Sequence, residues 1–176
     1  IENRFKCVHA GIGDTWVGKP TGSPLRAEDA RSTVDSLQRS GLPVKLDERI
    51  DRVLWEKLAV NASVNGITAI MNCRNGAIVD NPHGLSLVTN ICAEVGQVME
   101  ASRIPPVTEL LSNVTRVMHQ SAGNFSSMRQ DIILDRPTEI DYINGFVVKK
   151  GVLLGVPTPT NRAIFDLVKM KEQLRT

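Results

Sequence analysis

The chain has 176 residues, 41% of them hydrophobic, and 21 basic against 19 acidic residues give a formal net charge of +2. This composition is typical of one folded domain, or of one domain with part of another, and not of a disordered chain. The near balance of charge and the 4% aromatic content do not indicate a nucleic acid or an anionic membrane as partner.

The three cysteines and three histidines are widely separated along the chain. An odd cysteine count without short spacings argues against a disulfide framework and against a metal cluster. No stretch approaches the roughly 20 apolar residues of a membrane span, and no basic leader precedes an apolar signal core. We therefore expect a cytoplasmic protein without a bound metal.

The pattern of residues 1–46 predicts the end of an α/β domain, because short expected strands alternate with an expected helix. Gly11 and Gly13 do not make a dinucleotide-binding loop, since no third glycine follows three residues later. The chain also begins without Met, which suggests a cut inside a longer protein or a processed product. The expected elements are strands at 5–11 and 15–19 with a turn at 12–14 between them, a helix at 27–40 ending at Gly41, and a strand at 42–46.

Residues 47–176 predict an all-helical domain, so the chain as a whole is expected to be mainly α. A turn is expected at 73–76, where Cys, Arg, Asn and Gly follow one another. The expected helices are 48–71, with a possible kink at Gly66, then 85–102, 107–122, 126–134 (capped by Asn124 or Ser126), 138–154 and 161–173.

A polar stripe on the first of these helices is the main functional signal. Lys57, Asn61 and Asn65 are spaced four residues apart, so they share one face over about 12 Å. The rest of the run is mostly apolar, and a buried polar stripe needs a partner. One interpretation is a solvated helix edge. The other is a site in which burial lowers the pKa of Lys57, so that it acts as a general acid while the amides orient a polar substrate.

Two later segments allow similar pairs of interpretations. Ser126 and Ser127 begin a predicted helix and either cap it or bind an anion such as a carboxylate with help from helix-terminal amides. Glu139 follows Pro137 and Thr138 and either starts a helix or accepts a hydrogen bond from a ligand hydroxyl.

Taken together in order, these segments resemble the ketopantoate reductase (2-dehydropantoate 2-reductase) family. The similarity is carried by Trp55-Glu56-Lys57-Leu58-Ala59-Val60-Asn61, Asn65-Gly66-Ile67-Thr68-Ala69-Ile70, Asn72-Cys73-Arg74-Asn75-Gly76, Ser126-Ser127-Met128-Arg129-Gln130-Asp131 and Thr138-Glu139-Ile140-Asp141-Tyr142-Ile143-Asn144-Gly145.

The resemblance implies an NADPH-dependent reduction of 2-dehydropantoate to pantoate, on the pathway to pantothenate and coenzyme A. It implies a helical domain of the 6-phosphogluconate dehydrogenase C-terminal type (residues 47–176), preceded by the tail of a Rossmann domain (1–46). The residue roles that it implies are proton donation by Lys57, substrate binding by Asn61, Asn65, Asn75 and Ser127, and cofactor contact by Glu139.

The chain departs from the family pattern in three respects, one of which is that a further substrate-contacting asparagine of the family, from the nucleotide-binding half, is absent. Gly66 stands where a proline often follows the second asparagine, and the glycine-rich cofactor loop is missing, so we expect this chain alone to be inactive. A reductase of another 2-keto acid and a non-catalytic helical dimerisation module remain alternatives. A small keto acid is the expected partner, and a homodimer is possible.

Overall fold

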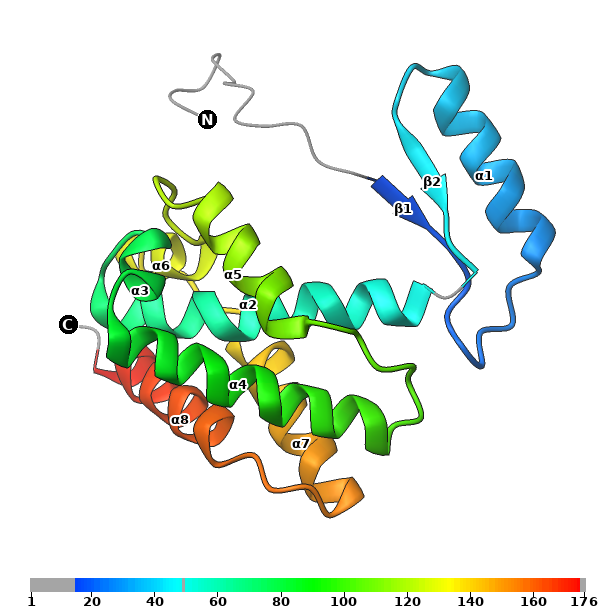
Figure 1. Cartoon of the computed structure of the whole chain (residues 1–176). Helices are drawn as coiled ribbons and strands as arrows, with labels where there is room; N and C mark the ends of the chain where they lie inside the picture. Colours follow the sequence, from blue (N-terminus) through cyan, green and yellow to red (C-terminus); the bar gives the residue numbers. More distant parts are fainter. Residues whose placement is uncertain (1–14, 49, 175–176) are drawn as a thin grey trace. The chain divides into compact units, whose positions relative to one another are not determined.

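The structure is a computed structural model that describes residues 15–48 and 50–174. Its contacts divide the chain into two units, Ile1–Val53 and Leu54–Thr176. The described residues are mainly helical, as the sequence predicts, and they contain a sheet of two strands (Figure 1).

A strand–helix–strand segment makes up the described part of the first unit. Strand β1, Thr15–Val17, pairs in parallel with β2, Val44–Leu46, and helix α1, Ala27–Arg39, connects them. Parallel strands need such a crossover, because a tight turn would return the chain in the opposite direction. The predicted helix and the strands at 15–19 and 42–46 are thus confirmed. The predicted strand 5–11 and turn 12–14 lie outside the described residues.

The second unit contains only helices among its described residues. Helix α2 begins in the first unit and continues into the second. The elements are α2, Ile50–Met71; α3, Gly76–Val79; α4, Pro82–Ala101; α5, Leu110–Gln120; α6, Ser127–Ile133; the 3₁₀ turn η1, Ile140–Tyr142; α7, Asn144–Leu154; and α8, Pro159–Gln173.

Helix α2 supplies much of the core of the second unit, since residues 62–69 are all buried. Helix α7 contacts it through Asn144, whose Nδ2 donates to the carbonyl of Ala62 at 3.1 Å. Helix α8 contacts it at Gly66, where an added Cβ would lie 2.3 Å from Cγ2 of Ile164. The helix is continuous through Gly66, and the glycine permits close packing of α8 against it.

A buried polar network joins three helices around α2. Glu94 on α4 accepts hydrogen bonds from the backbone N–H groups of Thr160 (2.7 Å) and Asn161 (2.9 Å). The Asn161 side chain donates to Glu94 at 2.7 Å and accepts from Asn144 Nδ2 at 3.0 Å. The Glu94 carboxylate thus satisfies donors in the first turn of α8, which would otherwise lack partners.

The structure corrects two predictions about the elements. The expected single helix 138–154 is interrupted at Ile143, whose ψ of −97° lies outside the helical range. The short helix α3 follows the predicted turn and was not expected, because four residues show too little periodicity.

The described residues contain neither a membrane-spanning helix nor a metal-binding cluster. No helix within residues 15–48 and 50–174 is long and apolar enough to cross a membrane. No group of His, Cys, Asp and Glu side chains in the same residues is placed to hold a metal ion.

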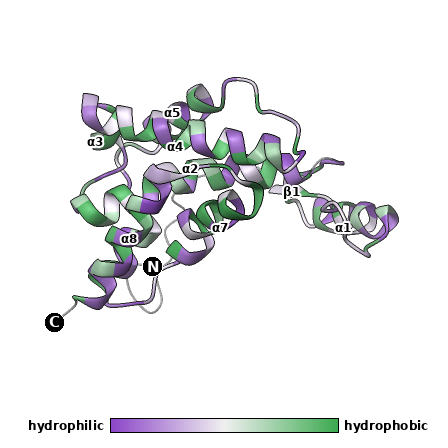
Figure 2. Ribbon diagram, turned by 90° about the horizontal axis from the view of Figure 1, so that it is seen from below, coloured by the Kyte–Doolittle hydropathy of each residue, from purple (hydrophilic) through white to green (hydrophobic). Residues whose placement is uncertain are grey.

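Helix α7 is largely hydrophobic (Figure 2), and Val152 and Leu153 near its end are exposed.

Candidate functional site

The polar stripe of Lys57, Asn61 and Asn65 lies on the part of α2 that belongs to the second unit. Its burial increases along the helix: Lys57 is exposed, Asn61 is half-buried, and Asn65 is 7% exposed. The burial expected for Lys57 is therefore wrong for this chain, because the fully covered part of α2 begins at Ala62. Lys57 forms no ion pair within the described residues, so its ammonium group is open to water or a ligand.

A short chain of hydroxyl hydrogen bonds fixes the buried end of the stripe. Thr68 Oγ1 donates to the carbonyls of Val64 (2.9 Å) and Asn65 (3.0 Å). Its oxygen lies 2.6 Å from Oγ of Ser126, and that Oγ accepts from the backbone N–H of Arg129 at 3.1 Å. Ser126 therefore caps α6 and holds the start of that helix against α2.

Ser127 is the first residue of α6 and is exposed, whereas Ser126 is 6% exposed. The sequence left open whether these serines cap the helix or bind an anion. In the structure Ser126 is the cap, and Ser127 has an accessible hydroxyl. The expected help from helix-terminal amides is weaker than predicted, because α6 has seven residues and Ser126 already occupies the Arg129 amide.

Asn75 is buried in a turn that docks on a second loop. Its N–H donates to the carbonyl of Asn124 (3.0 Å), and its side-chain Nδ2 donates to Oγ of Ser121 (3.2 Å). The N–H of Gly76 donates to the carbonyl of Ala122 at 3.2 Å. Oδ1 of Asn75 is buried and has no partner among the described residues. These contacts show that Asn75 holds the two loops together.

Glu139 precedes η1, and its side chain is exposed and makes no capping hydrogen bond. The preceding residue is fixed, because the N–H of Thr138 donates to Oε1 of Glu172 at 2.8 Å. Burial acts to raise the pKa of Glu172, but the hydrogen bonds from Thr138 and the nearby charge of Lys169 outweigh it, and the pKa lies below its ordinary value. The Glu139 carboxylate thus has no hydrogen-bond or ion-pair partner within residues 15–48 and 50–174, while α8 anchors the backbone just before it.

Three of the predicted side chains lie at or beside one structural feature. We call residues 72–76 and 121–127 the two-loop platform. It carries Asn75 and Ser127, and the hydrogen bond from its Ser126 to α2 reaches the helical turn of Asn65.

Lys57 and Glu139 are joined to this platform by no hydrogen bond or ion pair within the described residues. The start of α7 does reach the middle of the stripe, because Asn144 bonds to the carbonyl of Ala62, the residue after Asn61. All six predicted residues therefore lie in the second unit, and the hydrogen bonds near them run through Thr68, Ser126 and Asn144.

Sequence reasoning missed the residues that hold these positions. Thr68, Asn144 and Asn161 are buried polar side chains, and Glu94 is 8% exposed. Glu94 does carry a recognisable signal, since it interrupts the apolar face of a helix between Ile91 and Val95. Its partners lie more than 60 residues away and have no such signal.

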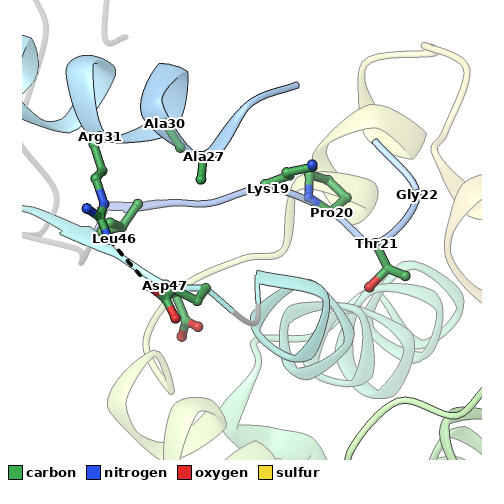
Figure 3. Close-up of a pocket in the computed structure, with 10 residues that line it drawn as sticks. Lys19, Pro20, Thr21, Gly22, Ala27, Ala30, Arg31, Leu46 and Asp47 are labelled. Carbon is green, nitrogen blue, oxygen red and sulfur yellow. Dashed lines mark ion pairs between the residues drawn. The ribbon is translucent and has the colours of Figure 1, made fainter. Parts of the chain in front are cut away.

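Two cavities lie apart from the predicted residues. One in the first unit has a volume of about 410 Å³, and Arg31 at its edge pairs with Glu48 at 3.8 Å (Figure 3). The other, in the second unit, is an apolar groove of about 390 Å³ beside Cys73. Burial raises the pKa of Cys73, against the opposing charge of Arg129. Neither cavity is lined by a predicted site residue.

Residues 49–172 match the sequence model of a family described as the C-terminal domain of ketopantoate reductase (Ketopantoate reductase PanE/ApbA C terminal). The match covers α2 to α8 and therefore contains every predicted site residue.

Curated relatives carry the name 2-dehydropantoate 2-reductase. One from Vibrio cholerae is 42% identical over 168 residues, which cover 94% of this chain and 55% of that protein. One from Pyrobaculum aerophilum is 43% identical over 138 residues, or 78% of this chain and 50% of that protein. The chain thus spans about half the length of these relatives.

Among solved structures, the chain is similar to D-mandelate dehydrogenase in a ternary structure with NADH and anilino(oxo)acetate. The TM-score is 0.85 at 27% identity, and the match covers 93% of this chain and 68% of that chain.

Proposed function

Since this chain belongs to the ketopantoate reductase family through its C-terminal domain, we propose that it forms the substrate-binding and proton-donating part of a reductase. The proposed reaction converts 2-dehydropantoate to pantoate with NADPH, on the way to pantothenate and coenzyme A. The observation that carries the proposal is the exposed Lys57 on the same helical stripe as Asn61 and Asn65.

The substrate is a 2-keto acid with a carboxylate, a ketone and a hydroxyl group to recognise. The amides of Asn61 and Asn65 have both donors and acceptors for the ketone and hydroxyl oxygens. The exposed hydroxyl of Ser127 donates to the carboxylate. The Thr68–Ser126 hydrogen bond fixes the spacing of these two groups of contacts.

Lys57 supplies the proton that the reaction needs. Reduction adds a hydride to the carbonyl carbon and a proton to its oxygen, and Nζ of Lys57 gives that proton as the C–O bond becomes an alcohol. Its positive charge also stabilises the negative charge that develops on the oxygen. Because Lys57 is exposed, it regains its proton from water.

Glu139 fits a contact with the cofactor. Its carboxylate is exposed and free of capping bonds, so it accepts a hydrogen bond from a ligand hydroxyl such as a ribose. When bound, the nicotinamide cofactor supplies the hydride. Asn75, whose amide nitrogen bonds to Ser121, acts in this proposal mainly by holding the platform in place.

A second candidate is the reduction of a different 2-keto acid with NADH or NADPH. The observation that favours it is the similarity to D-mandelate dehydrogenase, which was solved with NADH and an oxoacetate ligand.

A substrate panel separates the two candidates. The complete polypeptide that carries this chain is assayed with 2-dehydropantoate and with aromatic and aliphatic 2-keto acids, each with NADPH and with NADH. The proposal predicts the highest kcat/KM for 2-dehydropantoate with NADPH. A clear preference for another keto acid supports the second candidate, and failure to reduce any of them rejects both.

A further inference from the structure

Two arginines share one aromatic ring on the two-loop platform. The guanidinium carbon of Arg74 lies 4.3 Å from the centroid of the Phe125 ring, and that of Arg129 lies 3.6 Å from it. Both distances lie within the range of cation–π contacts, which restrain the two guanidinium groups at the ring.

The two positive charges are not balanced by the described residues. Neither Arg74 nor Arg129 pairs with a carboxylate within residues 15–48 and 50–174. Arg74 instead donates to the carbonyl of Gly123, and Nε of Arg129 is buried and has no partner in the described part of the chain. Two cations held on one ring repel each other, and an anion beside them relieves that repulsion.

The pair also lies close along the chain to two of the residues predicted to contact the substrate. Arg74 immediately precedes Asn75, and Ser127 lies between Phe125 and Arg129 in the chain. The hydrogen bonds that join the two loops hold these segments together. The keto acid is an anion, and the other proposed substrate contacts apart from Lys57 are uncharged.

We propose that Arg74 and Arg129, stacked on Phe125, form a cationic pair that selects keto acids with a free carboxylate. This inference rests on the proposed function and adds a specificity determinant to it. Guanidinium groups hydrogen-bond carboxylates through paired N–H donors, so the pair favours the ionised acid over its uncharged amide or ester. Phe125 is a positioning residue, because it orients the guanidinium groups without reaching the carboxylate.

The test compares Arg74→Gln and Arg129→Gln in the complete polypeptide with the control Arg116→Gln. Arg116 is exposed on α5, and its side chain bonds to Gln120 at 3.4 Å. KM is measured for 2-dehydropantoate and for its uncharged amide. Arg74→Gln and Arg129→Gln are each expected to raise KM for the acid by roughly tenfold, as for the loss of a charge-assisted hydrogen bond, with KM for the amide and kcat nearly unchanged. Arg116→Gln is expected to change none of these values.

Equal changes in KM for the acid and the amide, or no change for either, would overturn the inference while leaving the proposed function intact. Failure of the unaltered polypeptide to reduce any keto acid would reject the proposed function itself. A separate titration of the 176-residue chain with 2-oxobutanoate and with its amide, followed by NMR of the arginine Nε–H groups, tests the pair without turnover. Shifts at Arg74 and Arg129 with the acid only are expected, and identical spectra with both probes would contradict the inference.

Discussion

Ser126 and Ser127 are adjacent residues with opposite surroundings, and this contrast gives a prediction at the scale of the residue. Ser126 caps α6 and bonds to Thr68, so Ser126→Ala is expected to lower the free energy of unfolding by about 1–2 kcal/mol. Ser127 is exposed, so Ser127→Ala is expected to leave stability unchanged and to raise KM for the keto acid severalfold. Denaturant unfolding and steady-state kinetics measure the two effects.

The two serine variants serve as controls for each other. If Ser127→Ala lost stability and kept its KM, the assignment of the exposed hydroxyl to the carboxylate would be wrong.

The spacing of Lys57, Asn61 and Asn65 was enough to predict a shared helix face, because helix geometry is local. The burial of each residue was not predictable in the same way. Lys57 is exposed and Asn65 is nearly covered, although both lie in an apolar run. The burial of each residue depends on helices that are distant in sequence. The sequence of the apolar segment does not show where those helices pack.

At the scale of the element, Gly66 decides how closely α2 and α8 approach. Gly66→Ala would place a Cβ 2.3 Å from Ile164 and is expected to lower the free energy of unfolding by about 1–3 kcal/mol. Gly96 on α4 is the matched control, since an added Cβ there meets nothing within 4 Å. Gly96→Ala is expected to raise stability by up to about 1 kcal/mol, because alanine favours the helix. Similar effects at both sites would contradict the close packing.

The contact between Glu172 on α8 and the residue before η1 gives a pH-dependent prediction. Because the pKa of Glu172 is lower in the folded chain than its ordinary value, the ionised form adds stability above the unfolded pKa of about 4.3. That contribution is lost as the pH falls through the lower folded pKa. Glu172→Gln is thus expected to cost stability at pH 7 and to cost none at strongly acidic pH. Urea unfolding at both pH values measures the difference, and an equal cost at both would contradict it.

Helix lengths were predicted well where an apolar period ran for three turns or more, as in α2 and α4. The break at Ile143 was not predicted, because residues 138–154 have an unbroken helical pattern in the sequence. In the structure the break leaves Asn144 as the first residue of α7, with its side chain in the buried network. Tertiary hydrogen bonds formed by distant residues therefore override the local pattern.

At the scale of the whole molecule, the family relationship could be identified from short motifs in the expected order. The residues that bind most of the cofactor could not be identified in this chain. The 176 residues contain no Gly-x-Gly-x-x-Gly segment, and the chain spans about half of its relatives. We expect this chain alone to bind NADPH weakly or not at all, since Glu139 is the one cofactor contact proposed within it. Isothermal titration calorimetry measures this, and low-micromolar binding would contradict the expectation.

The possible homodimer is also a prediction at this scale. Exposed hydrophobic side chains such as Val152 and Leu153 are available for contacts between copies. Sedimentation equilibrium of the 176-residue chain measures the mass, and a monomer at all concentrations would reject the prediction.

The most direct test of the central proposal is the turnover of Lys57→Ala in the complete polypeptide, beside Lys149→Ala. Both lysines are exposed, so neither change is expected to disturb the fold, as circular dichroism can verify. Loss of the proton donor is expected to lower kcat by about 10²- to 10⁴-fold, while Lys149→Ala keeps its full rate. Full turnover by Lys57→Ala would contradict the assignment of Lys57 as the proton donor.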